Sequence, residues 1–158
     1  MVGREVFEHI SEEACREFEA IVGPKNITTD PVICEGYTGR GFDRQVFWFY
    51  GISRPPAAVI LPKTTDDVVR IVKTCNRFEI PYIPMVTYGM CFTGPAYRDD
   101  IMLIDLKRMD KMEIDDKNMF AIVEPGVVFG QLQGDVLKRG LTSIVPGGGG
   151  QVSVLANT

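Results

Sequence analysis

Two loops of the sequence combine residue types that can hold an anionic ligand with few charged side chains. The first, residues 84–95, carries two glycines and three hydroxyl side chains directly after a short apolar run. Glycines let backbone N–H groups approach a phosphate, and open α/β sheets bind their ligands at the carboxyl ends of buried strands. A plain surface connection is the alternative interpretation, and spacing alone leaves both open.

The second loop, residues 146–150, is a proline followed by four consecutive glycines. Without a Cβ atom, such a backbone can come very close to a ligand, although a flexible tail is the alternative. The sequence has no Gly-x-Gly-x-x-Gly pattern that opens a helix after a strand, and no Gly-x-x-x-x-Gly-Lys pattern. Ordinary nicotinamide and P-loop nucleotide sites are therefore disfavoured.

Acid–base and metal chemistry have few candidate residues in this chain. The four cysteines (Cys15, Cys34, Cys75 and Cys91) form no Cys-x-x-Cys pair, and His9 is the only histidine. A zinc or iron–sulfur site needs closely spaced Cys and His ligands, so no metal site is expected. No residue stands out as a catalytic acid or base, and the catalytic residues stay unassigned.

The composition limits the classes of partner. Seventeen Lys and Arg against 21 Asp and Glu give a formal charge of -4, with no basic cluster of the kind that binds nucleic acid. The apolar runs are far shorter than the roughly 20 residues of a membrane span. The N-terminus lacks the apolar core of a signal peptide, which predicts a cytoplasmic protein. A length of 158 residues with 45% hydrophobic content suffices for one folded core.

The elements that must position these loops begin with a helix over residues 11–22, with Ser11 as N-cap and Gly23-Pro24 as its end. Residues 25–44 are dense in Gly, Pro, Thr and Asp and predict an extended arm. The arm ends in an aromatic run, residues 47–50, for which packing on the core and contact with another subunit are both open. Residues 1–50 are accordingly predicted to be an N-terminal helix and extended aromatic arm, separate from residues 51–158.

The remainder alternates strand and helix patterns. The predicted elements are, in order, a buried strand at 57–61, a helix from Thr64 to Phe78, strands at 80–84 and 101–106, a hairpin of 111–115 with 120–124, and a helix at 128–137. Strand, helix and strand within about thirty residues indicate a parallel crossover unit. The predicted fold class is α+β with α/β layers, a parallel βαβ subdomain followed by an antiparallel strand and helix portion.

The order of several motifs resembles a known family. These are Arg54-Pro-Pro-Ala-Ala-Val-Ile-Leu-Pro, Met102-Leu-Ile-Asp-Leu-Lys-Arg-Met, Ala121-Ile-Val-Glu-Pro-Gly-Val and the terminal Pro-Gly-Gly-Gly-Gly. Together they resemble the N-terminal part of the FAD-binding PCMH-type domain of the FAD-linked oxidases, the group of vanillyl-alcohol oxidase, p-cresol methylhydroxylase and the glycolate oxidase FAD subunit. The resemblance implies two subdomains that clasp an extended FAD, in an incomplete fold without the substrate cap domain.

The resemblance also implies roles for individual residues. Val86, Thr87, Tyr88, Gly89, Met90, Cys91, Thr93 and Gly94 match the loop that wraps the FAD pyrophosphate, and Pro146, Gly147, Gly148, Gly149 and Gly150 match the segment that runs beside the flavin. Residues 124–127 match a motif whose role is expected to be structural. A diphosphate held where cations are few needs backbone donors, which agrees with the composition of the first loop.

The implied function is that of an FAD-binding portion or subunit of a flavin-dependent oxidoreductase, which transfers hydride from a hydroxy acid, alcohol or phenolic substrate to FAD. Another chain or a C-terminal region would complete it, through a second protein subunit or self-association, and the small-molecule substrate would bind mainly outside this chain. Met90 and Cys91 replace a polar pair of the family pattern. The alternative is therefore a non-catalytic structural subunit of a larger complex that keeps the fold but has lost flavin binding.

Overall fold

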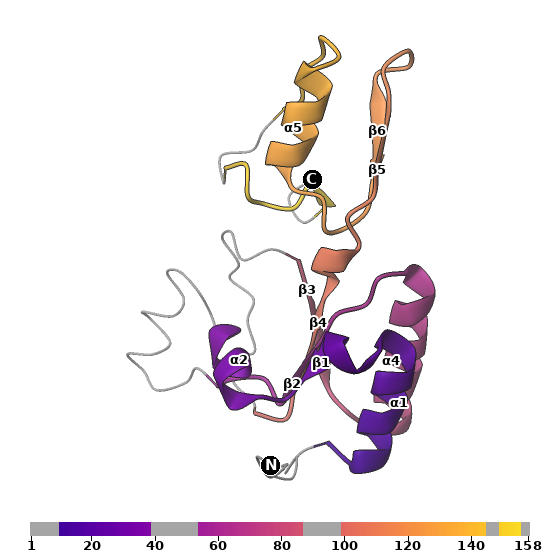
Figure 1. The fold of residues 1–158 in the computed structure, drawn as a ribbon, viewed down its shortest axis with the longest axis vertical. Helices are drawn as coiled ribbons and strands as arrows, with labels where there is room; N and C mark the ends of the chain where they lie inside the picture. The colour runs from indigo at the N-terminus through magenta and orange to yellow at the C-terminus, as the bar shows by residue number, and fades with distance from the viewer. Residues whose placement is uncertain (1–9, 39–53, 87–98, 145–148, 156–158) are drawn as a thin grey trace.

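The computed structural model describes residues 10–38, 54–86, 99–144 and 149–155, and in these residues the chain forms two units placed end to end (Figure 1). The first unit holds a four-stranded sheet with helices on both faces. The second holds a two-stranded sheet beside one helix. The strand that leads out of the first unit continues directly into the second.

The first unit contains two long helices whose ends are set by local sequence. Helix α1 (Glu12–Val22) begins at Ser11, whose side chain accepts a hydrogen bond from the Ala14 N–H at 3.2 Å. Helix α4 (Thr65–Arg77) begins with a capping box between Thr64 and Asp67. Such caps satisfy N–H groups that have no partner inside the helix. Both predicted helices are confirmed.

The four-stranded sheet has the order β1-β2-β4-β3. Strands β2 (Ala58–Ile60) and β3 (Tyr82–Met85) both run parallel to β4 (Met102–Asp105), which lies between them. Strand β1 (Ile27–Thr28) pairs antiparallel with β2 at the edge. The predicted strand–helix–strand unit is confirmed as β2, α4 and β3, with β4 inserted between its two strands.

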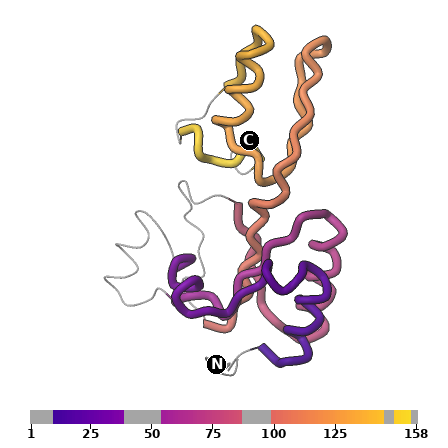
Figure 2. The backbone as a smooth tube through the Cα atoms, viewed as in Figure 1, coloured from indigo at the N-terminus to yellow at the C-terminus, as the bar shows by residue number. Residues whose placement is uncertain are grey.

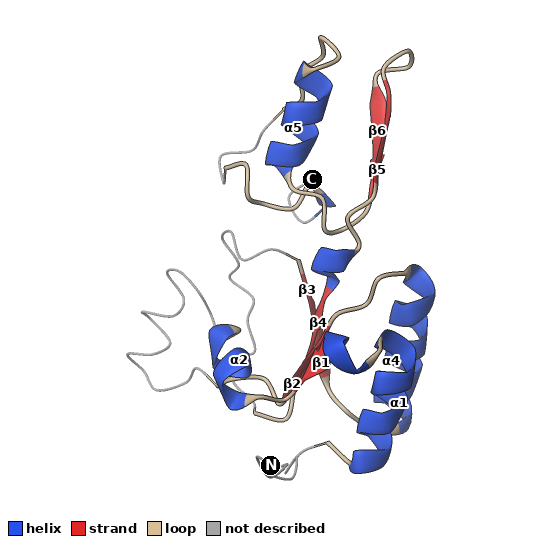
Figure 3. Ribbon diagram, viewed as in Figure 1, coloured by secondary structure: helices blue, strands red, loops and turns tan. Residues whose placement is uncertain are grey.

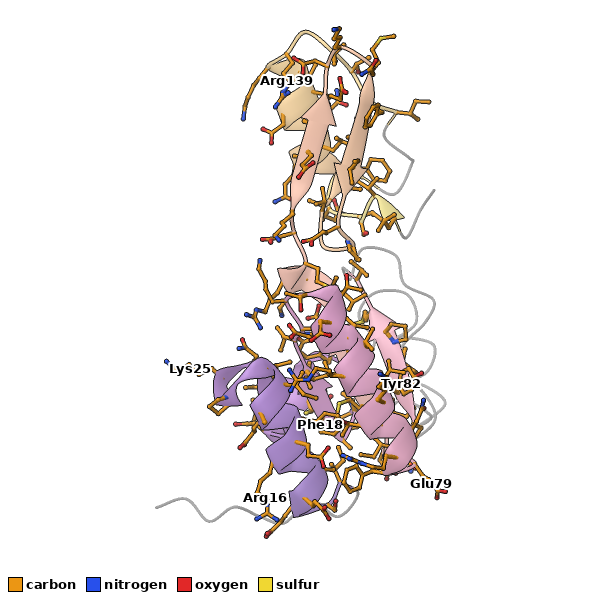
Figure 4. The ribbon with its side chains drawn as sticks, turned by 90° about the vertical axis from the view of Figure 1, so that its right-hand side faces the viewer. Arg16, Phe18, Lys25, Glu79, Tyr82 and Arg139 are labelled. Atoms are coloured by element: carbon orange, nitrogen blue, oxygen red, sulfur yellow. The ribbon has the colours of Figure 1, made fainter. Side chains whose placement is uncertain are left out.

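Alternate residues of these strands pack against helices on opposite faces of the sheet. Ile60 and Met102 lie in a core with α1 and α4, whereas Val59 and Leu103 pack on the other face with Cys34. Phe18 of α1 lies in the first of these cores, on the side of α1 that faces α4 (Figure 4). Val59 and Leu103 are fully buried, as expected of strands covered on both faces.

The extended arm predicted from residue 25 is wrong for its first part. The chain instead forms a 3-10 turn, η1 (Pro24–Asn26), then β1 and a short helix, α2 (Pro31–Gly36). Asp30 caps α2 by accepting hydrogen bonds from the N–H groups of Val32 and Ile33, and Pro31 suits the first helical position. The turn-forming residues therefore start a helix. The aromatic run 47–50 lies outside the described residues.

The turn η2 (Leu106–Arg108) links the two units, and the second unit consists of a hairpin, a helix and a returning segment (Figure 2). Strands β5 (Met112–Asp115) and β6 (Phe120–Val123) pair antiparallel, and α5 (Phe129–Leu137) lies beside them. Both the hairpin and the helix agree with the sequence prediction. The core members are Val127, Phe129, Leu132, Val136 and Val154.

Candidate functional site

The parallel strands β2, β3 and β4 end at one edge of the first sheet, and this carboxyl edge lies on the side of the second unit (Figure 3). Leu61, Val86 and Leu106 are the residues that directly follow these strands. Ligands of open α/β sheets bind outside the carboxyl ends of the strands. The edge is therefore the candidate cofactor site.

Three of the thirteen residues predicted to bind the cofactor lie in the described part of the chain: Val86, Gly149 and Gly150. Val86 directly follows β3, whose last residue, Met85, pairs with Asp105 of β4. The first predicted loop therefore leaves the carboxyl edge, as the sequence pattern indicated. The predicted residues outside the described part are Thr87, Tyr88, Gly89, Met90, Cys91, Thr93, Gly94, Pro146, Gly147 and Gly148.

Gly150 lies against the start of α5. The Gly130 N–H donates to the Gly150 carbonyl at 2.7 Å, and a Cβ atom on Gly130 would lie 3.0 Å from that oxygen. Gly149 has a φ of +90°, a conformation that favours glycine. Close approach between two backbones thus accounts for part of this glycine run, a role that the sequence analysis missed because Gly130 is twenty positions away.

The returning segment continues this contact. Phe129 donates its N–H to the Val152 carbonyl at 3.0 Å, and Val154 donates to the Val127 carbonyl at 3.0 Å. The Ser153 hydroxyl donates to the Pro125 carbonyl at 2.6 Å. The first two N–H groups of α5, those of Phe129 and Gly130, therefore donate to backbone carbonyls of the returning segment.

The motif at 124–127 packs against the turn η2, which follows β4. The Gly126 N–H donates to the Met109 carbonyl at 2.6 Å, and a Cβ atom on Gly126 would lie 2.7 Å from the carbonyl oxygens of both Lys107 and Met109. A side chain at this position would clash with backbone on two sides. The contact agrees with the structural role expected for the motif.

A polar network at the carboxyl edge was not predicted. Asp105, the last residue of β4, is 2% exposed, and its Oδ2 atom accepts a hydrogen bond from the Tyr37 hydroxyl at 2.8 Å. The Lys107 ammonium donates to the Tyr37 hydroxyl oxygen at 2.7 Å and lies 3.0 Å from the same carboxylate oxygen. The Lys107 N–H donates to Oδ1 of Asp105 at 3.0 Å. Three groups from two distant segments thus meet at a buried carboxylate.

The network keeps its lysine charged. Partial burial lowers the pKa of Lys107, but hydrogen bonds with Tyr37 and Asp105 and the Asp105 charge outweigh it, so this pKa is raised above its ordinary value of 10.5. Burial is the main cause that raises the pKa of Tyr37 above 10.0, with the Lys107 bond acting in the opposite direction. The site therefore presents a neutral phenol and a cationic ammonium at neutral pH.

Further cations follow β2 and β4. The Lys63 ammonium donates to the Arg108 carbonyl and to Asp110, each at 2.7 Å, and the Arg108 guanidinium donates to the Leu61 carbonyl at 2.7 Å. The cationic side chains here are Lys63, Lys107 and Arg108, and Asp66, Asp67, Asp105 and Asp110 lie in the same segments, 61–67 and 105–110, so the edge carries no excess of positive charge. The exposed Lys107 ammonium is the donor that fits an anionic group such as the diphosphate of a dinucleotide.

Comparison with known proteins identifies the protein family to which the chain belongs. Residues 56–158 match the family model of the FAD binding domain, so the chain belongs to this family. The cofactor predicted from the sequence, FAD, is thereby confirmed. The match includes β2, α4, β3 and β4 of the first unit and the whole second unit, whereas α1, β1 and α2 lie before it.

Individual relatives agree with this assignment. The flavoprotein subunit of 4-cresol dehydrogenase (hydroxylating) from Pseudomonas putida is 31% identical over 124 residues, 76% of this chain and 23% of the relative. A crystal structure of p-cresol methylhydroxylase with substrate bound superposes with a TM-score of 0.68 and 28% identity, over 82% of this chain and 25% of that one. The predicted α+β, PCMH-type fold class is confirmed.

A 4-ethylphenol oxidase from Gulosibacter chungangensis superposes over 95% of this chain and 29% of its own, with a TM-score of 0.76 and 26% identity. The chain thus spans about a quarter of the length of the relatives that it matches.

No helix among the described residues is long and apolar enough to cross a membrane. In the same residues, no three His, Cys, Asp or Glu side chains cluster in a way that could hold a metal ion.

Proposed function

We propose that this chain is the FAD-binding portion of an oxidoreductase that transfers hydride from a hydroxy acid, alcohol or phenolic substrate to FAD. The observation that carries the proposal is the FAD-binding family match over residues 56–158, which contains the carboxyl edge of the parallel strands β2, β3 and β4. When bound, FAD supplies the hydride acceptor. The chain itself supplies contacts that hold and orient the cofactor.

The residues proposed to hold the cofactor belong to both loops of the sequence analysis. Residues 86–94 would surround the diphosphate with backbone N–H groups and hydroxyls, since this stretch starts where β3 ends. Residues 146–150 would run beside the flavin. The backbone contact of Gly130 with Gly150 supports this by fixing the end of the glycine run at the start of α5.

The substrate is proposed to bind mainly to polypeptide outside this chain, either a second subunit or a further region. The matched relatives are about four times longer than the matched segment, and one of them is named as a flavoprotein subunit. The acid–base groups of the reaction would then come from that polypeptide. The names of the relatives, 4-cresol dehydrogenase and 4-ethylphenol oxidase, make phenols the first substrates to test.

Titration of the purified chain with FAD tests the proposal. We expect quenching of flavin fluorescence to saturate for the unsubstituted chain, and Gly89→Val and Gly148→Val to weaken FAD binding at least about tenfold, because a side chain would displace the cofactor. Gly134→Ala is the matched control, since nothing lies within 4 Å of a Cβ atom at Gly134. Circular dichroism establishes that each variant is folded.

A folded chain that ignores added FAD would contradict the proposal and favour the second candidate, a non-catalytic subunit of a larger complex that keeps the fold without the flavin. The sequence observation behind this candidate is that Met90 and Cys91 replace a polar pair of the family pattern. Unchanged FAD affinity in both valine variants would instead contradict the assignment of the two loops.

A further inference from the structure

From the network at the carboxyl edge, we infer that Lys107 binds the anionic diphosphate of FAD and that Asp105 and Tyr37 are positioning residues that hold its ammonium in place. The inference rests on the proposed function and adds a cationic ligand to the two loops. None of these three side chains belongs to the residues that sequence motifs predicted to bind the cofactor.

The location of Lys107 is the first reason. It lies two residues beyond the end of β4, and Asp105 is the register partner of Met85 at the end of β3. The Lys107 side chain is 52% exposed, whereas the Asp105 side chain that anchors it is 3% exposed. An exposed cation is thus fixed at the edge outside the carboxyl ends of the parallel strands, where open α/β sheets bind their ligands.

The hydrogen bonding of the network is the second reason. Asp105 receives three donors: the Tyr37 hydroxyl, the Lys107 ammonium and the Lys107 backbone N–H. The hydroxyl and the backbone N–H are neutral donors, so Asp105 holds the ammonium as an ion pair while these donors fix the carboxylate in place. Of the three N–H bonds of the ammonium, two are directed to Tyr37 and Asp105 within the described residues. One donor remains for an external oxygen.

An ordinary surface ion pair would not be built in this way. Exposed pairs usually contribute little, because holding two long side chains costs conformational entropy. Here a buried carboxylate and a half-buried phenol, 68 positions apart in the sequence, fix the ammonium from two elements. A cation held in advance loses little freedom on binding, which is the condition for a strong contact with a phosphate group.

The experiment measures FAD affinity and its salt dependence for the 158-residue chain, using FAD itself as the probe. We expect Lys107→Met to weaken FAD binding about tenfold and to reduce the loss of affinity on adding salt, because one charge contact is gone. Lys107→Arg should retain most of the affinity. Lys138→Met is the matched control, since Lys138 is an exposed lysine that pairs with Asp135 in the second unit.

The positioning role of Tyr37 has its own test. Tyr37→Phe removes only the hydroxyl and should weaken FAD binding less than Lys107→Met does. In the Lys107→Met background the same substitution should have no further effect, since the hydroxyl acts through the lysine. Additive losses in the double variant would overturn the positioning role.

The outcomes distinguish a wrong role for Lys107 from a wrong proposed function. Equal FAD affinity of Lys107→Met and Lys138→Met would overturn the inference while leaving the proposed function intact. A weaker Lys107→Met chain with an unchanged salt dependence would also overturn it, because such a loss would come from damaged structure. Failure of the unsubstituted chain to bind FAD would overturn the proposed function, and the inference with it.

Discussion

The two units of the molecule protect their strands in different ways. In the first unit, the residues of β2 and β4 are buried on both faces, between α1 and α4 on one side and α2 on the other. In the second unit, only one face of the hairpin is covered, and Phe120 and Ile122 of β6 are 51% and 62% exposed. Isolated two-stranded hairpins are marginally stable in water.

In the second unit, backbone hydrogen bonds and polar side-chain contacts compensate for the smaller buried apolar area. The returning segment bonds to residues 127–130, and the Arg139 guanidinium donates to the Ile114 carbonyl at 3.0 Å and to Asp116 at 3.1 Å. The stability of the first unit therefore rests on buried apolar area, whereas that of the second rests more on close backbone contacts and on its attachment through Gly126. The difference predicts which substitutions each unit tolerates.

The largest expected effect separates two isoleucines in strands of the two units. Ile60→Ala should lower the free energy of unfolding by about 3 kcal/mol, because Ile60 is fully buried and its loss leaves a cavity. Ile122→Ala is the matched control and should change it by less than about 1 kcal/mol, since Ile122 is mostly exposed. Urea denaturation measures both. Equal losses would break the contrast between the units.

A smaller effect is expected at the attachment of the second unit. Gly126→Ala should destabilise the chain by about 2 kcal/mol, because its Cβ atom would press on the carbonyls of Lys107 and Met109. Gly134→Ala in α5 should stabilise it by about 1 kcal/mol, because alanine favours a helix and the position is open. Thermal unfolding of the two variants should move in opposite directions, and a tolerated alanine at Gly126 would contradict the described junction.

The smallest effect concerns pH and a helix cap of the first unit. Burial alone would raise the pKa of Asp67, but N–H groups of Lys63 and Thr64 bond to its carboxylate and bring the pKa below its ordinary value of 3.8. The stabilisation is therefore complete above pH 3.8 and is lost as the pH falls through the folded-state pKa. Asp67→Asn should reduce the dependence of the free energy of unfolding on pH in this acidic range, measured by urea denaturation at a series of pH values. Parallel curves for the two proteins would argue against the capping box.

Most elements were predictable because their signals are local. Ser11 and Thr64 mark helix starts next to residues that they bond, and the buried strand at 58–60 is apolar throughout. Helix α2 was missed because Asp30 and Pro31 also favour turns, and only the burial of Cys34 against Val59 and Leu103 selects the helix. The residues that cap this helix were therefore visible in the sequence, but the same residues also favour a turn.

The candidate site was predictable only in outline. Glycines and hydroxyls after a strand indicate a phosphate loop, and family motifs strengthen that prediction. The partnership of Asp105 with Tyr37 joins residues 68 positions apart, and the approach of Gly130 to Gly150 joins backbones across a helix. Such pairs depend on how elements pack, which local patterns in one sequence do not encode.

The strand order also has a consequence for the newly made chain. In the order β1-β2-β4-β3, the central strand β4 comes after both of its neighbours in the sequence. During synthesis, β2 and β3 therefore cannot pair with their common partner until residue 105 has left the ribosome. Until then their apolar faces stay exposed, because their burial requires this late, non-local pairing. The hairpin of the second unit forms from neighbouring residues. The unit with the better protected core is thus the one most exposed to aggregation during synthesis.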